Sequence, residues 1–217
     1  MPFQDRADAG RRLAERLRSL ELHAPVVLGL PRGGIPVAAE VSAALGAPLD
    51  VLVARKVGMP GHQELGIGAV AEGLDETVVS DVARQLGVSP DALDALAARE
   101  RVELERRVQL YRRGRPLPAL AGRDVVLVDD GLATGVTAEA GLRALAHPEP
   151  SRLVLGVPVC ARETAARLAD LAEVVCVEAP ARFVAVGQWY RDFAQTTDEE
   201  VIDLLARGAA PSQGLPR

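Results

Sequence analysis

The sequence predicts an α/β fold, with a Rossmann-like parallel sheet flanked by helices. Short apolar runs alternate along the chain with stretches of helical periodicity, and this order is typical of strand–helix–strand units with right-handed crossovers. The chain has 217 residues, of which 48% are hydrophobic, enough for one sizeable core. Only 3% are aromatic, so Val, Leu and Ala must build that core.

The order of the elements follows from these patterns. A first helix over 5–20 is predicted by an apolar stripe at helical spacing, Ala9, Leu13, Leu17 and Leu20. Apolar runs predict strands at 25–30, 49–54, 77–80, 125–128, 153–159 and 173–178. Further helices are expected at 35–45, 89–113, 138–145, 163–171 and 198–205. The longest of them starts with Ser89 as a suitable N-cap and Pro90 in the first helical position.

Three segments do not fit the strand–helix alternation. The glycine-rich segment 57–75 predicts a mobile loop, with a short hairpin as the alternative. Residues 81–114 predict a helical arm, whose heavily charged helix indicates a solvated face or a packing surface. Gly, Pro, Ser and Gln predominate in 207–217, which predicts a disordered tail after a single domain over 1–206.

Charge and composition exclude several classes of function. A net charge of −5 and a pI near 5.3 argue against a general nucleic-acid binder. No apolar run reaches transmembrane length and the N-terminus lacks a signal-peptide core, so we expect a cytoplasmic protein without membrane attachment. Cys160 and Cys176 lie in apolar stretches and predict buried, reduced thiols. The three His residues show no ligand spacing, which makes a zinc site improbable.

The stretch 125–137, Val-Val-Leu-Val-Asp-Asp-Gly-Leu-Ala-Thr-Gly-Val-Thr, is the most informative part of the chain. A buried strand ends in Asp129 and Asp130, and a loop of small residues leads into a helix. Such a loop gathers backbone N–H groups at a helix N-terminus, so a phosphate is expected on 133–137. The two acids would repel that phosphate unless they face sugar hydroxyls or a metal ion. A simple capping turn, the alternative without a ligand, needs only one acid or hydroxyl.

This stretch resembles the phosphoribosyl-pyrophosphate (PRPP) signature of the type I phosphoribosyltransferases. The family pattern is an apolar strand, two acids, two variable residues and a Thr/Ala-Thr-Gly-x-Thr loop. The resemblance covers most of residues 24–195 and implies that family's fold. It also implies that Ala133, Thr134, Gly135, Val136 and Thr137 bind the 5-phosphate of PRPP. Asp129 and Asp130 would hold the ribose hydroxyls, directly or through Mg²⁺ or water, and act as the catalytic pair.

Two further segments correspond to pyrophosphate-binding parts of the resembling family. Arg32, Gly33 and Gly34 follow the first core strand, where two glycines let the backbone approach a ligand and an arginine supplies a fork of donors. A tight turn without a ligand is the alternative. Lys56 stands after the second strand and is assigned to the same phosphates, whereas Arg55 could pair with an acid as part of the structure. Residues 57–64 correspond in order to the family's flexible loop, which closes over the site and excludes water.

Four of the six aromatic residues follow the last core strand, namely Phe183, Trp189, Tyr190 and Phe193. In purine-type members of the resembling family, a hood beyond the sheet holds the base, so we expect a hood at about 179–197 with part of the N-terminus. Phe183 and Trp189 are the better candidates for stacking on the acceptor. A satellite core or an oligomer contact are the alternatives. The hood sequence departs from the purine, orotate and uracil enzymes, which leaves the acceptor open.

The combined pattern implies a Mg²⁺-dependent enzyme of nucleotide metabolism that transfers a 5-phosphoribosyl group from PRPP to a nucleobase-like, heterocyclic acceptor and releases pyrophosphate. The alternative is a PRPP- or nucleotide-sensing regulator of the same fold. A receiver-like domain is set aside because the next strand ends without an acid. Residues 66–71 match a dinucleotide fingerprint but do not close an apolar strand, so that function is rejected. The charged arm and the first helix could both serve a homodimer.

Overall fold

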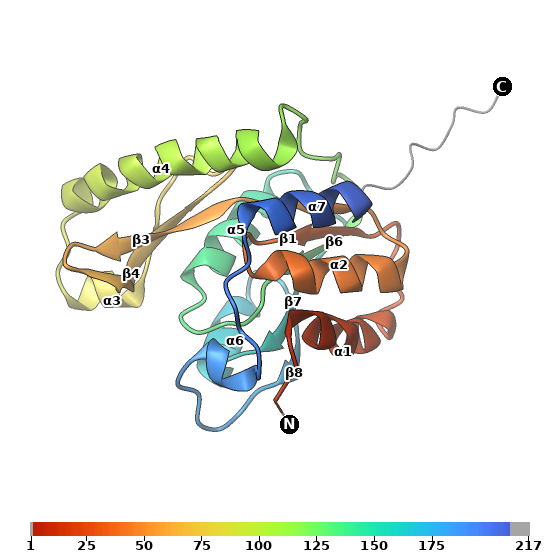
Figure 1. Cartoon of the computed structure of the whole chain (residues 1–217). Coiled ribbons are helices and arrows are strands. Elements are labelled where there is room, and N and C mark those ends of the chain that lie inside the picture. The colour runs from red at the N-terminus through yellow and green to blue at the C-terminus, as the bar shows by residue number, and fades with distance from the viewer. Residues whose placement is uncertain (1, 209–217) are drawn as a thin grey trace.

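The computed structural model describes residues 2–208, apart from the side chains of residues 63 and 64. Its core is a parallel sheet of five strands in the order β2-β1-β6-β7-β8 (Figure 1). These strands are β1 (Val26–Gly29), β2 (Leu49–Val51), β6 (Asp124–Val128), β7 (Arg152–Val159) and β8 (Glu173–Glu178). The predicted α/β class with a parallel sheet is therefore confirmed.

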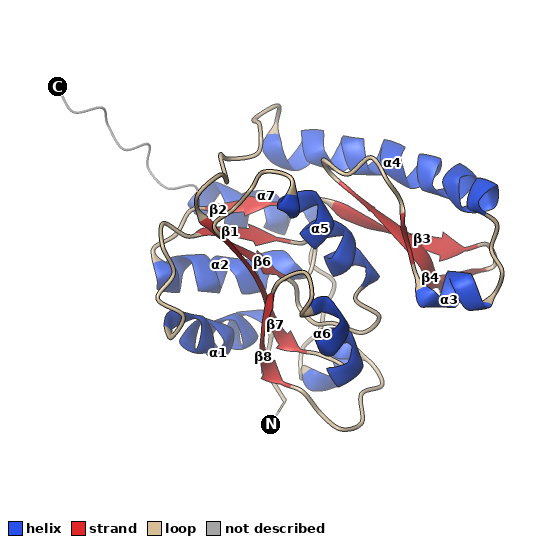
Figure 2. Ribbon diagram, turned by 180° about the vertical axis from the view of Figure 1, so that it is seen from behind, coloured by secondary structure: helices blue, strands red, loops and turns tan. Residues whose placement is uncertain are grey.

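Helices cover both faces of this sheet, which explains why its central strands are apolar without interruption. One face carries α1 (Arg6–Arg18), α2 (Gly34–Leu45) and α7 (Asp198–Gly208), and the other carries α5 (Val136–Ala146) and α6 (Arg162–Leu168), as Figures 1 and 2 show from opposite sides. Successive side chains of a strand alternate between the two layers. Val126 and Val128 of β6 belong to the cluster with α1 and α2, whereas Val125 and Leu127 belong to the cluster with α5.

A second, antiparallel sheet stands beside the core and corrects the prediction of a mobile loop. It contains β3 (Ala54–Met59), β4 (His62–Ala71) and β5 (Val78–Val79) in the order β3-β4-β5. The glycines that suggested mobility instead permit close packing: a Cβ at Gly68 would lie 2.7 Å from the Val78 carbonyl oxygen. The second core strand is also shorter than predicted, ending at Val51, so Lys56 lies on the separate hairpin.

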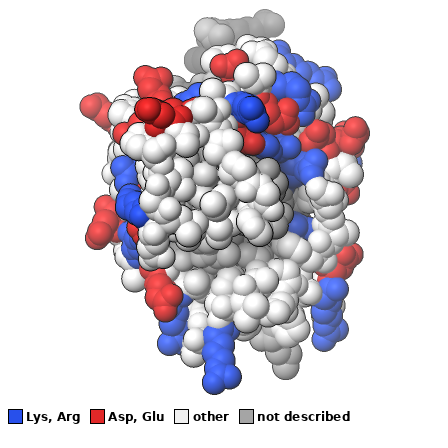
Figure 3. Space-filling model, turned by 90° about the vertical axis from the view of Figure 1, so that its left-hand side faces the viewer, with Lys and Arg blue, Asp and Glu red and all other residues white. Residues whose placement is uncertain are grey.

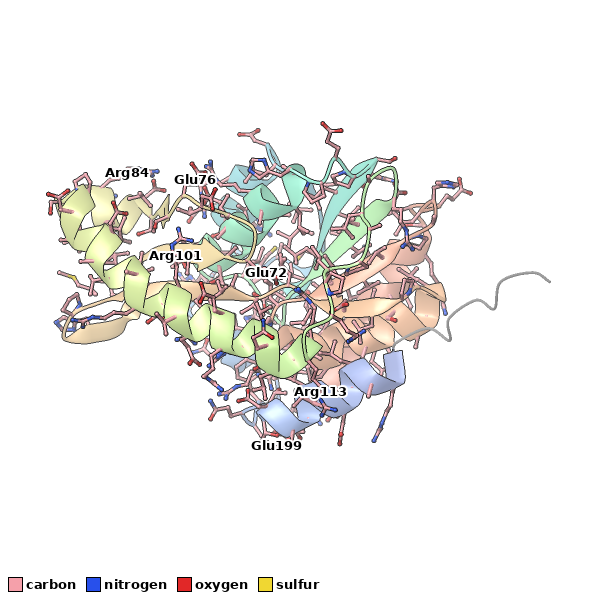
Figure 4. The ribbon with its side chains drawn as sticks, turned by 90° about the horizontal axis from the view of Figure 1, so that it is seen from above. Glu72, Glu76, Arg84, Arg101, Arg113 and Glu199 are labelled. Atoms are coloured by element: carbon pink, nitrogen blue, oxygen red, sulfur yellow. The ribbon has the colours of Figure 1, made fainter. Side chains whose placement is uncertain are left out.

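The predicted helical arm consists of α3 (Asp81–Gln85) and α4 (Pro90–Arg112). Ser89 caps α4, because its Oγ accepts a hydrogen bond from the Ala92 N–H group at 3.3 Å. Arg55 of β3 binds Glu100 in the middle of α4 at 2.7 Å. Figure 4 shows Arg101 pointing from α4 toward the turn after β4, where Nη1 donates to the Leu74 carbonyl at 2.9 Å.

The C-terminal end of α4 is anchored in the core by a buried arginine. Arg112 is only 2% exposed and pairs with Glu72, which lies beside this end of α4 in Figure 4. Its Nη2 also donates to the Val51 carbonyl oxygen at 2.9 Å, and its Nε lies 3.4 Å from Asp50 Oδ1. Tyr111 donates from its hydroxyl to Asp198 of α7 at 2.6 Å. The arm is thus joined to both the sheet and the last helix.

The segment after β8 packs on the start of the chain. It contains a short 3-10 helix, η1 (Val186–Trp189), and Phe3 pairs with Tyr190 as an isolated bridge. Phe3 and Tyr190 are buried in a small cluster of their own, and Phe183 and Trp189 pack on its edge. The last helix extends through Arg207 and Gly208, which the sequence assigns to the tail; residues 209–217 lie outside the described residues. Within 2–208, no helix is both long and apolar enough to cross a membrane.

Candidate functional site

The site lies where β1 and β6 end side by side, and two glycines bring their loops together. A Cβ at Gly33 would overlap the Asp130 carboxylate, and one at Gly34 would lie 2.7 Å from the Val128 carbonyl oxygen. Only glycine allows this approach. The peptide bond between Pro31 and Arg32 is cis. The topology therefore joins the two predicted motifs, although position 34 stands 91 positions before position 125 in the sequence.

Helices α2 and α5 follow β1 and β6 at this edge, and neither start has a side-chain cap. Helix α6, which follows β7, also lacks one, whereas side-chain oxygens cap α1, α3 and α4. At α2 the backbone already uses the first-turn donors: the N–H groups of Gly34 and Ile35 donate to the Leu30 and Arg32 carbonyl oxygens at 3.0 and 3.2 Å, and Pro36 has no N–H group. At α5, whose N-cap is Gly135, the N–H groups of 136–138 precede the first helical hydrogen bond, which Glu139 donates to the Gly135 carbonyl at 2.8 Å. Uncapped first-turn N–H groups carry partial positive charge and suit anions, so the start of α5 is suited to a phosphate.

The loop before α5 is braced from α6. Gly135 has φ of 71°, in the left-handed region, and a Cβ there would overlap the Thr164 side chain. Thr164 donates from Oγ1 to the Ala133 carbonyl at 2.6 Å, and Arg167 donates to the Thr134 carbonyl at 2.6 Å. Ala133 and Thr134 are exposed, and Thr134 lines a cavity of about 510 Å³. With its carbonyls engaged from behind, the loop has a fixed shape.

The acid pair is held by the backbone and by an arginine from α1. Asp129 Oδ1 accepts the Asp130 N–H group at 2.8 Å, and Asp130 Oδ2 accepts from Arg6 Nε at 2.9 Å. Burial raises the pKa of Asp129 well above its usual value, and the charge of Asp130 adds to this increase. Burial also raises the pKa of Asp130, whereas the Arg6 guanidinium opposes that rise. The two acids therefore have unequal environments.

These residues fit Mg²⁺ as an ion that arrives largely with its substrate. The described residues include no group of three or more His, Cys, Asp or Glu side chains that could hold a metal. Two carboxylates are nevertheless present together, and Mg²⁺ in proteins is commonly bound by one or two carboxylates and substrate phosphates. Cys160 and Cys176 are free thiols.

Arg32 and Lys56, the two basic residues predicted to bind pyrophosphate, approach different helices. Arg32 Nη1 lies 3.7 Å from Asp198 Oδ1, so this arginine faces the start of α7. The stem of Lys56 passes over Gly66, where a Cβ would lie 3.0 Å from Lys56 Cδ and 3.6 Å from a Val136 methyl group. Lys56 therefore approaches the start of α5. Arg55 pairs with Glu100 and so has the structural role considered for it as the alternative to ligand binding.

Of the four hood aromatics, Tyr190 contacts Asp130, and Phe193 packs on Arg6, the partner of Asp130. The Tyr190 hydroxyl donates to the Asp130 carbonyl oxygen at 2.6 Å, and burial raises the pKa of this tyrosine. The Arg6 guanidinium lies 4.0 Å from the centre of the Phe193 ring. Phe183 and Trp189 are half-buried against the small cluster around Phe3 and Tyr190. This packing corresponds to the satellite core considered as the alternative to stacking on the acceptor.

Sequence reasoning missed three side chains that shape this site, Arg6, Thr164 and Arg167. Thr164 and Arg167 lie on the helix that follows the next strand, and only the crossover places them behind the loop. Arg6 stands in an ordinary charged position of α1, 124 residues from Asp130. No local pattern distinguishes it from its neighbours.

Comparison with known proteins agrees with this geometry. The phosphoribosyl transferase domain model matches residues 3–190. The chain is 49% identical over 206 residues to a Mycobacterium tuberculosis protein named "Putative phosphoribosyl transferase Rv0571c". That match covers 94% of this chain and 46% of the relative, so the chain spans about half the length of the curated relatives it matches.

Solved structures show the same fold. The crystal structure of TT1426 from Thermus thermophilus is 49% identical, covers 96% of this chain and 100% of its own, and has a TM-score of 0.80. A hypothetical protein from Neisseria gonorrhoeae with bound ppGpp has a TM-score of 0.51 over 96% of this chain and 98% of its own. Its 13% identity supports similarity of fold alone.

Proposed function

Because this chain belongs to the phosphoribosyl transferase domain family, we propose that it transfers a 5-phosphoribosyl group from PRPP to a nucleobase-like, heterocyclic acceptor, with Mg²⁺ and with release of pyrophosphate. The observation that carries this proposal is the contact between Gly33 and Asp130. It brings the predicted pyrophosphate loop against the predicted ribose-binding acids, beside the uncapped start of α5. A single ligand with phosphates at both ends would extend from the start of α5, past the acids, to the Gly33 loop.

Each part of PRPP has a group suited to it. The first-turn N–H groups at 135–137 would bind the 5-phosphate, and Asp129 with Asp130 would accept hydrogen bonds from the ribose hydroxyls. Gly33, Gly34 and Lys56 would bind the pyrophosphate, and Arg32 would join them on leaving Asp198. Mg²⁺, when bound, would neutralise the leaving group.

The reaction then follows from these positions. The bond between ribose C1 and the pyrophosphate oxygen breaks, and its electron pair leaves with pyrophosphate. Positive charge develops on the ribose ring, where the two carboxylates stabilise it. A nitrogen of the acceptor forms the new bond to C1 and gives its proton to one of the two carboxylates. The hairpin 54–71 and the hood would keep water from competing with the acceptor.

A second function, PRPP or nucleotide sensing without transfer, is favoured by one specific observation. Arg32, which the transferase would need for pyrophosphate, is already paired within the chain, with Asp198 at 3.7 Å. A sensor could keep this pair while binding its ligand through the N–H groups at the start of α5. Such a protein would bind PRPP and release no pyrophosphate.

Pyrophosphate release separates the two functions. The wild-type protein is incubated with PRPP, Mg²⁺ and a panel of heterocyclic bases, and PRPP binding is measured in parallel by calorimetry. Release with at least one acceptor supports the transferase, and binding without release across a broad panel supports the sensor. The double substitution Asp129→Asn with Asp130→Asn should nearly abolish turnover and keep the fold. Full activity in that variant would refute the assigned role.

We also propose the binding partners, the oligomeric state and the location of the protein. Net charge of −5 supports small-molecule partners rather than nucleic acids. On the face in Figure 3, Lys and Arg side chains are interspersed with Asp and Glu around an uncharged centre. The proposed homodimer can be tested by sedimentation equilibrium, and the proposed cytoplasmic location by cell fractionation.

A further inference from the structure

Arg6 connects three parts of the site that are distant in the sequence. Its Nε and Nη2 both lie 2.9 Å from Asp130 Oδ2. Its Nη1 donates to the Ala194 carbonyl oxygen at 2.7 Å, and its guanidinium lies over the Phe193 ring. The side chain is only 12% exposed, and that of Asp130 is 16% exposed. Two nitrogens of one guanidinium thus lie on a single carboxylate oxygen, and such a partly buried ion pair holds that oxygen more firmly than a surface ion pair does.

The start of α1 is itself fixed to the hood, which makes this contact rigid. The Asp5 side chain caps α1 by accepting the Asp8 N–H group at 2.7 Å. Just before it, the Phe3 N–H group donates to the Trp189 carbonyl at 2.7 Å. The backbone that carries Arg6 therefore cannot shift without moving the hood.

The hydrogen bonds within the chain use one oxygen of each acid. Asp130 Oδ2 is taken by Arg6, and Asp129 Oδ1 is taken by the Asp130 N–H group. Among the described residues, no hydrogen bond or ion pair from another residue engages the other two oxygens, Asp129 Oδ2 and Asp130 Oδ1. Two unused acceptors on adjacent residues match two adjacent hydroxyl donors on a ribose ring.

We infer that Arg6 is a positioning residue for the acid pair: by occupying Asp130 Oδ2, it leaves Asp130 Oδ1, together with Asp129 Oδ2, for the ribose hydroxyls. Through Ala194 and Phe193, the same side chain sets the hood relative to these acids. This inference rests on the proposed function, because it requires that the acids bind ribose. Arg6 itself touches no reacting atom.

Lysine cannot replace this arginine, and another arginine of α1 provides the control. An ammonium group is a point charge without the planar fork, so Arg6→Lys keeps the charge and loses the orientation. Arg12 resembles Arg6 in its chemistry, since it binds Asp8 at 2.7 Å and lies 5.2 Å from the Phe3 ring. Its ion pair is with Asp8 rather than with either acid of the site, so Arg12→Gln removes a similar pair elsewhere on the same helix.

Two probes separate a positioning role from a general structural one. Ribose 5-phosphate carries the hydroxyls, and inorganic pyrophosphate does not; both are titrated by calorimetry in the presence of Mg²⁺. Arg6→Lys and Arg6→Gln should weaken ribose 5-phosphate binding by about 10-fold to 100-fold, the usual effect of losing a charged hydrogen bond. The affinity of the Arg6 variants for pyrophosphate should change less than about 2-fold. In the control Arg12→Gln, the affinities for ribose 5-phosphate and for pyrophosphate should both change less than about 2-fold.

A double-mutant cycle completes the test. In the Asp130→Asn background, Arg6→Gln should no longer weaken ribose 5-phosphate binding, because the two residues act through one contact. Three results would each overturn the inference and leave the proposed function intact. In the first, the Arg6 variants lose affinity equally for ribose 5-phosphate and for pyrophosphate. In the second, the two substitutions of the cycle have additive effects, and in the third, Arg6→Lys binds ribose 5-phosphate as tightly as the wild type or more tightly. Failure of the wild-type protein to bind ribose 5-phosphate or PRPP would refute the proposed function and the inference with it.

Discussion

Gly135→Ala should destabilise the protein more than a left-handed backbone alone can explain. Gly135 has φ of 71°, and an L-residue in this region costs about 1–2 kcal/mol. The added Cβ would also overlap Thr164 and lie 3.3 Å from Leu168 Cδ1, and overpacking of this kind costs about 1–3 kcal/mol. Together the two effects predict a loss of about 2–5 kcal/mol in the free energy of unfolding.

Two further variants separate these contributions in urea denaturation. Gly122 has φ of 68°, and a Cβ at this position would have no atom within 4 Å, so Gly122→Ala should cost only about 1–2 kcal/mol. Thr164→Ser removes the overlapping methyl group and retains the hydroxyl that binds the Ala133 carbonyl. In the Gly135→Ala background, Thr164→Ser should therefore recover the overpacking part of the loss.

The reasoning fails if Gly135→Ala and Gly122→Ala reduce the free energy of unfolding equally. It also fails if Thr164→Ser gives no recovery. The midpoint of unfolding should move without a change in the slope against urea concentration, since the surface exposed on unfolding is nearly the same. Because the loop 133–137 is proposed to bind the 5-phosphate, Gly135→Ala should weaken ribose 5-phosphate binding as well.

Three other changes test the structure away from the loop. Arg112→Met leaves the buried Asp50 and the partly buried Glu72 without their cation and should cost about 3–5 kcal/mol in urea denaturation, so a loss well under 1 kcal/mol would contradict a stabilising role for these pairs. Ser89→Ala should lower the free energy of unfolding by about 1 kcal/mol and leave ligand binding unchanged. Folding raises the pKa of Asp129, so its carboxyl group stabilises the folded state below its unfolded pKa and loses this contribution as pH rises through the folded pKa. Asp129→Asn should therefore raise the Tm at neutral pH and flatten its decline between acidic and neutral pH; an unchanged Tm profile would refute this.

The core could be predicted from the sequence because burial on both faces leaves a plain signal. Val125 to Val128 form an unbroken apolar run, and β6 is buried at every position. The predicted limits of strand β8, Glu173 and Glu178, are the observed ones. The acid pair and the Gly33 loop are each recognisable from local sequence, and parallel topology places the ends of such strands at one edge.

The hairpin and the partners of the acids could not be predicted in the same way. Glycine permits both mobility and close packing, and the sequence does not show that Val78 and Lys56 approach Gly68 and Gly66. Arg6 is matched to Asp130 only by tertiary structure, as is Arg32 to Asp198. Side-chain pairing across distant elements leaves no periodic trace in a single sequence.

The attachment of α4 at two places joins the two predicted phosphate-binding cations. Arg55 of the hairpin pairs with Glu100 in the middle of this helix. Near its end, the Tyr111 hydroxyl donates to Asp198, the ion-pair partner of Arg32. The hairpin that carries Lys56 and the helix that binds Arg32 are thus both fixed to α4, so the positions of the two cations depend on one helix.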